Sequence, residues 1–139
     1  MNSKRNGKGS NYYPDGGLFE GSWRNNLQEG WGKYKFASGE EYEGYWKEGK
    51  RFGRGTNRFQ NGGLYEGEWK NDVQEGYGTQ TFPSGERYQG EWARGKRNGF
   101  GINFFISGNK FEGEWLDNNM HGFGVYSFVS GERYEGGWQ

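Results

Sequence analysis

Tyr65-Glu66-Gly67-Glu68-Trp69 is a five-residue stretch whose pattern recurs along the whole chain. The aromatic residue that opens the pattern, here called the opener, occurs six times at a constant step of 23 residues, without insertion or deletion. The openers are Phe19, Tyr42, Tyr65, Tyr88, Phe111 and Tyr134. A fixed period of this size is typical of a repeat array, in which each repeat packs on its neighbours.

Other landmarks share this period. Each repeat carries a pair of glycines around one residue, as in Gly76-Tyr77-Gly78, then an aromatic residue such as Phe82 and a single glycine such as Gly85. The array therefore divides into an N-terminal half-repeat at 1–18, repeats at 19–41, 42–64, 65–87, 88–110 and 111–133, and a partial repeat at 134–139. No cap follows Trp138, and repeat arrays normally need one, so we expect a fragment of a longer array.

Each repeat is predicted to form two strands. In residues 65–70, alternation places the opener, the central glycine and the tryptophan on one face and the charged residues on the other. Residues 71–75 are rich in turn formers and are expected to form a loop, followed by a second strand at 76–82. Residues 83–86 form a tight turn in which Gly85 adopts a left-handed conformation. Neither strand has a helical period.

The glycines suggest how neighbouring strands pair. If Phe36 pairs with Tyr42, then Tyr34 faces Gly44 and Gly32 faces Trp46, so that a Trp ring covers a bare glycine. A slip of one residue would turn every ring to the solvent. The sequence therefore predicts an all-β fold, an elongated, single-layer, twisted antiparallel β-meander of tandem 23-residue hairpins with one aromatic face.

Composition restricts the function. The chain has 139 residues with 18 basic and 18 acidic side chains, and this balance argues against a nucleic-acid partner. It has no cysteine and one histidine, His121, which we expect to be an exposed loop residue. The usual parts of a metal centre or a nucleophilic triad are therefore missing, and we expect no enzyme activity, no metal and no cofactor. No apolar run approaches a membrane span and no secretory signal is recognisable, so we expect a cytoplasmic protein.

The repeat resembles the MORN repeat (membrane occupation and recognition nexus). The segment from Tyr65 to Gly85 is close to the family pattern, and the resemblance extends over essentially the whole chain. Lys8 and Arg54 depart from it by replacing the aromatic residue between paired glycines, and Gln89 replaces an acidic residue. The resemblance implies a scaffold of cytoskeletal, ciliary, budding or membrane-junction assemblies, or a module appended to a lipid kinase or lysine methyltransferase.

The aromatic face is the leading candidate site, because a single-layer sheet has no second layer to cover it and exposed aromatic edges mark binding surfaces. We expect a non-catalytic scaffold that presents a groove to a peptide or helix of a cytoskeletal, motor or membrane-associated protein. The predicted groove residues are Tyr34, Tyr42, Trp46, Tyr65, Trp69, Tyr88, Trp92, Phe111, Trp115 and Tyr126. Positions 34, 57, 80, 103 and 126 vary on this face and are expected to tune specificity.

Three alternatives remain open. Basic residues in the predicted loops, with Arg54, favour a membrane-surface adaptor that binds anionic phospholipid; they are Lys50, Arg51, Arg54, Lys96 and Arg97. A second alternative is that the chain is a regulatory module of a larger enzyme. A strip on the opposite face that includes Phe100 and Phe123 favours a homodimer. The expected location is the cytoplasm, at the cytoskeleton, the cilium or the inner membrane surface.

Overall fold

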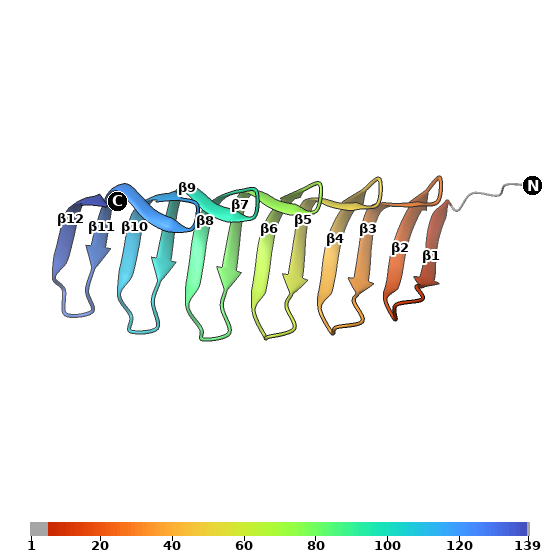
Figure 1. The fold of residues 1–139 in the computed structure, drawn as a ribbon, viewed down its shortest axis with the longest axis horizontal. Coiled ribbons are helices and arrows are strands. Elements are labelled where there is room, and N and C mark those ends of the chain that lie inside the picture. Colours follow the sequence, from red (N-terminus) through yellow and green to blue (C-terminus); the bar gives the residue numbers. More distant parts are fainter. Residues whose placement is uncertain (1–5, 139) are drawn as a thin grey trace, which may run out of the picture.

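The protein forms one open antiparallel sheet, in which every strand pairs with the strands next to it in the sequence. The computed structural model describes residues 6–138. Figure 1 shows the strands side by side along one long axis, with no second layer over the sheet. The strands are β1 (Gly7–Tyr12), β2 (Leu18–Arg24), β3 (Leu27–Lys35), β4 (Glu41–Lys47), β5 (Lys50–Arg58), β6 (Leu64–Lys70), β7 (Val73–Thr81), β8 (Arg87–Ala93), β9 (Lys96–Phe104), β10 (Lys110–Leu116), β11 (Asn119–Ser127) and β12 (Arg133–Trp138). The predicted all-β meander of hairpins is confirmed.

Two-residue turns connect the strands along one long side of the sheet. Between β6 and β7, Asn71 and Asp72 both have positive φ, at 48° and 73°, as a type I′ turn requires. The predicted loop at 71–75 is therefore wrong, because the ladder already resumes at Val73. Gly76, with φ at 78°, takes up the register shift that follows between Gly67 and Trp69.

Longer turns connect the strands along the opposite long side and set the strand register. The amide of Phe82 donates to Glu86 O at 2.8 Å and the amide of Gly85 donates to Phe82 O at 2.9 Å. Gly85 has φ at 99°, so the predicted left-handed glycine is confirmed.

The predicted strand register is wrong by two residues. Tyr34 pairs with Tyr42 and Gly32 with Gly44, because Phe36 closes the turn and is not part of the ladder. An even shift leaves each side chain on its predicted face.

The core is a continuous row of rings on one side of the sheet, which we call the front face. The openers from Phe19 to Phe111 are completely buried. Tyr65 contacts Trp69 of its own strand and Trp92 of the next repeat edge to face, with ring centroids 5.2 and 5.3 Å apart. Trp92 Nε1 also donates to Gly78 O at 3.0 Å. Each ring therefore binds its own repeat to the following one.

The paired glycines make room for the opener rings. Gly44 and Gly55 face each other across β4 and β5, and an added Cβ at Gly55 would overlap the Tyr42 ring. The ring over the glycines thus belongs to the opener and not to a tryptophan, as the predicted register had implied. Figure 1 shows that the strands bend as they approach the two-residue turns. Glycine lets the two backbones approach closely there.

We expect Gly55→Ala to lower the free energy of unfolding by about 2 kcal/mol, because the new methyl group must displace the buried Tyr42 ring. Gly9→Ala is the matched control. Gly9 holds the equivalent position in β1, where an added Cβ meets only Trp23 at 3.6 Å. Urea denaturation of both variants tests this, and equal losses of stability would contradict the role given to the ring.

A second prediction concerns the buried tyrosine hydroxyls. Those of Tyr42, Tyr65 and Tyr88 donate to the carbonyl oxygens of Tyr45, Glu68 and Glu91 at 2.9 to 3.0 Å. Burial is the largest cause that raises the pKa of all three above the ordinary value of 10.0. The folded state thus retains these protons more tightly than the unfolded chain does. Their contribution to stability is complete below the unfolded pKa and is lost as pH rises through the folded pKa.

The parent should therefore lose stability steeply above about pH 10. A variant with Tyr42→Phe, Tyr65→Phe and Tyr88→Phe should lose less, and Phe19 and Phe111 show that phenylalanine fits the position. Urea denaturation from neutral to alkaline pH measures both slopes. Equal slopes in parent and variant would refute this assignment.

Candidate functional site

Most of the predicted groove residues lie in the core. The openers Tyr42, Tyr65, Tyr88 and Phe111 have no exposed surface, and the tryptophans Trp46, Trp69, Trp92 and Trp115 retain only 5 to 6 %. The tryptophans therefore expose only narrow ring edges, and the openers expose none. Whether these residues contact a partner stays a prediction.

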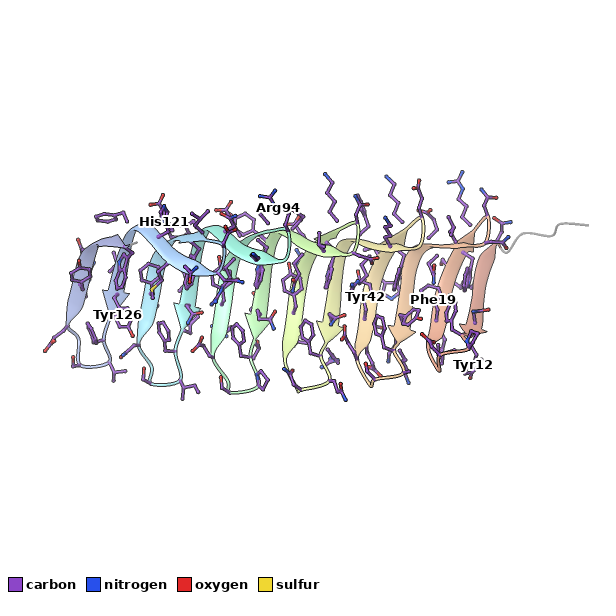
Figure 2. All side chains as sticks on the ribbon, viewed as in Figure 1. Tyr12, Phe19, Tyr42, Arg94, His121 and Tyr126 are labelled. Carbon is purple, nitrogen blue, oxygen red and sulfur yellow. The ribbon has the colours of Figure 1, made fainter. Side chains whose placement is uncertain are left out.

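Tyr34 and Tyr126, the remaining groove residues, are half-buried near the two ends of the front face. Tyr34 lies between Tyr13 and Phe36, with ring centroids 5.6 and 4.5 Å away. Tyr126 lies between Phe105 and Phe128 at 5.6 and 4.8 Å. Figure 2 marks Tyr126 near the C-terminal end and Tyr42 in the N-terminal half. Each tyrosine fills the space between its neighbouring rings.

Arg51 and Arg97 point into the front face and are not loop cations. The Arg51 guanidinium lies 4.5 Å from the Trp69 ring centre, and its Nε is 3.2 Å from Asp72 Oδ1. Arg97 lies 4.8 Å from the Trp115 ring centre. The predicted loop placement is therefore wrong for both arginines, because the short turns place them within β5 and β9. Lys50, Arg54 and Lys96 remain exposed, and lipid binding stays a prediction for these three.

Two buried asparagines lie against these arginines. Asn57 is fully buried and accepts a hydrogen bond from Arg51 Nη1 at 3.3 Å. Asn103 is 1 % exposed and accepts one from Arg97 Nη1 at 3.4 Å. The expectation that positions 57 and 103 tune specificity on the surface is therefore wrong, because neither side chain reaches it.

A hollow of about 300 Å³ opens in the middle of the front face. Gln80 lies in it at the position that Tyr34 and Tyr126 hold in other repeats. The sequence analysis did not identify this hollow, although glutamine at a position that is tyrosine in two other repeats is a signal for it. The lining residues are Phe59, Gln74, Gln80, Phe82, Trp92, Gly95, Arg97 and Asn118.

The opposite, outer face carries exposed rings. Tyr77, Phe100 and Phe123 are each more than half exposed. Arg54, Tyr77 and Phe100 also line a hollow of about 420 Å³ above Gly78 and Gly90. The predicted apolar strip is thus accessible, and the homodimer through it stays a prediction.

Other classes of site find little support in the described residues. Residues 6–138 contain no group of three or more His, Cys, Asp or Glu side chains that could hold a metal ion. His121 is exposed as expected, but it lies in strand β11, opposite Glu114, so the predicted loop placement is wrong (Figure 2). Within the same residues, no helix is long and apolar enough to cross a membrane.

Solved structures with this fold include two domains that hold a peptide. The TCP domain of SAS-4 (dCPAP) of Drosophila melanogaster, in complex with a proline-rich motif of Ana2 (dSTIL), matches with a TM-score of 0.61 at 12% identity. The match covers 92% of this chain and 70% of that domain. The TCP10 domain of Danio rerio CPAP, in complex with a peptide of STIL, matches with a TM-score of 0.50 at 13% identity, over 94% and 63%. These identities show a shared fold.

Sequence comparison gives the family. Alsin of Homo sapiens and Alsin of Rattus norvegicus are each 36% identical to this chain over 55 residues, which is 36% of this chain. The chain spans about 3% of the length of these curated relatives. The model of the MORN repeat matches residues 1–18, 19–41, 42–64, 65–87, 88–109 and 111–133. These matches cover nearly every residue, and the chain belongs to the MORN-repeat family.

Proposed function

We propose that this MORN array is a non-catalytic interaction module that holds an extended peptide segment of a partner protein in the front-face hollow. The carrying observation is the hollow itself. The position that Tyr34 fills in an earlier repeat is held by Gln80, between the partly buried rings of Phe59 and Phe82. A concave site with aromatic walls and a few polar groups is the usual form of a peptide anchor site.

Two further observations support a peptide as the ligand. The hollow lies on a sheet whose rings are fixed by close packing, so binding orders little of the protein and costs little conformational entropy. The two solved domains of the same fold are described in complex with a proline-rich motif and with a peptide. We further propose that the peptide belongs to a cytoskeletal or membrane-associated protein.

The other readings lose support or remain open. The membrane adaptor loses support from Arg51, whose guanidinium is paired with Asp72 and lies against Trp69. A role as the regulatory module of a larger enzyme remains a proposal, as does a location at the cytoskeleton, the cilium or the inner membrane surface.

The test begins with peptides selected on the parent protein from a displayed random library. Gln80→Tyr should weaken these peptides at least tenfold, because the new ring fills the hollow as Tyr34 fills the equivalent space. Fluorescence polarisation of labelled synthetic peptides measures the dissociation constants.

Tyr77→Ala on the outer face is the matched control and should leave the affinity unchanged. Thermal denaturation establishes that both variants are folded. If Tyr77→Ala weakens the peptides and Gln80→Tyr does not, the front-face hollow is not the binding site.

A further inference from the structure

The array contains two arginine sites that are related by 46 residues and differ in charge. Arg51 forms an ion pair with Asp72, with Nε 3.2 Å from Oδ1, and its Nη2 donates to Asp72 O at 3.1 Å. Arg97 makes the same two contacts with Asn118, at 3.4 and 3.1 Å. The second arginine has a neutral amide where the first has a carboxylate. Its cation therefore has no ion-pair partner among residues 6–138.

The asparagines that bind the two arginines also differ, because only the first has an acceptor for its side-chain amide. Asn57 Nδ2 donates to Glu40 Oε2 at 3.0 Å. Asn103 Nδ2 is buried and has no hydrogen-bond partner. Glu86, the equivalent of Glu40, is close enough for its charge to raise the pKa of Arg97, against the larger lowering by burial. It accepts no hydrogen bond from Asn103. The second site thus lacks the carboxylate charge that Asp72 gives the first site, and it lacks the acceptor that Glu40 provides to Asn57.

The open space lies beside the arginine without a carboxylate partner. Tyr34 has the same position in the sequence relative to Arg51 as Gln80 has relative to Arg97, and its ring packs against Phe36. Next to Arg97, Gln80 leaves a hollow that Arg97 and Asn118 both line. The neutral partner and the missing ring therefore occur together at one place in the array. An arginine has five N–H donors, and the hydrogen bonds to Asn103 and Asn118 use three of them.

We propose that the hollow is a subsite for an Asp or Glu side chain of the bound peptide, whose carboxylate pairs with Arg97 while an adjoining apolar residue packs between Phe59 and Phe82. The inference rests on the proposed function and adds the chemistry of the ligand. The carboxylate supplies the negative charge that Asp72 supplies to Arg51. The nearby charge of Glu86 disfavours a doubly charged phosphate more strongly than a singly charged carboxylate.

The test uses the tightest peptide from the library selection and its analogues with each Asp or Glu replaced by Asn or Gln. On the parent, one such replacement should weaken binding about tenfold, as loss of a charge-assisted bidentate pair does. Asn118→Asp gives Arg97 the carboxylate that Arg51 already has. This variant should bind the acidic peptide and its amide analogue equally.

Asn119→Asp is the matched control, because it adds the same charge at the next residue, which is exposed. It should retain the tenfold preference for the acidic peptide. A parent that binds both analogues equally overturns the carboxylate subsite, and Gln80→Tyr then reports separately on the hollow as the binding site. Vesicles of phosphatidylcholine with phosphatidylserine form the last arm. Vesicle binding that Asn118→Asp abolishes, with peptide binding unchanged, would assign Arg97 to lipid and overturn the proposal.

Discussion

The contact of each opener ring with a pair of glycines is the interaction on which the rest of this sheet depends. A single-layer sheet has no second sheet or helix to bury its apolar face, so the rings must bury one another. Tyr65 does so by lying over Gly67 and Gly78 while two tryptophans meet it edge to face. Each such aromatic pair contributes about 0.5–1.5 kcal/mol beyond the area that it buries. Glycine weakens an isolated strand, and here the covering ring offsets that cost.

The same contact links the repeats into one body. Trp69 and Trp92 both touch Tyr65, and Trp92 Nε1 donates to the carbonyl of Gly78 in the preceding repeat. Stability is therefore shared between neighbours, as in other repeat arrays. Residues that repeat without change serve this packing, and residues that vary between repeats are free to serve binding.

The period and the alternation predicted the elements of the fold but not all of their pairing. A period of 23 residues is the same whether Phe36 is the last residue of the ladder or the residue that closes the turn, so the register could not be read from it. The Asn71-Asp72 turn had a local signal, since both residue types tolerate the left-handed region. Because polar residues lie on both sides of this pair, the sequence does not show that the strand resumes at Val73.

The candidate site could not be predicted from a single repeat either. The sequence analysis places Arg51 and Arg97 in basic loops, although Met120 holds the equivalent position near the C-terminal end. A methionine at that position is a signal of an inward-facing residue, because the front face is where apolar side chains are buried. The hollow depends on Gln80 lying between two phenylalanines from neighbouring repeats, a contact that no single repeat contains.

Some residues recur only in every second repeat. The proposed subsite at Arg97 lies where one copy of this longer pattern differs from the other. Arg-Asn pairs occur at 51 and 57 and again at 97 and 103, and the full repeats before, between and after them carry glutamine, methionine or tyrosine at these positions. At the first pair Arg51 has a carboxylate partner and Asn57 Nδ2 has an acceptor, whereas the second pair lacks both a carboxylate for Arg97 and an acceptor for Asn103. Leaving a partly buried cation without a carboxylate lowers stability locally. Neighbouring repeats can support that cost because the ring row continues on both sides, and local costs of this kind are expected where a protein binds something else.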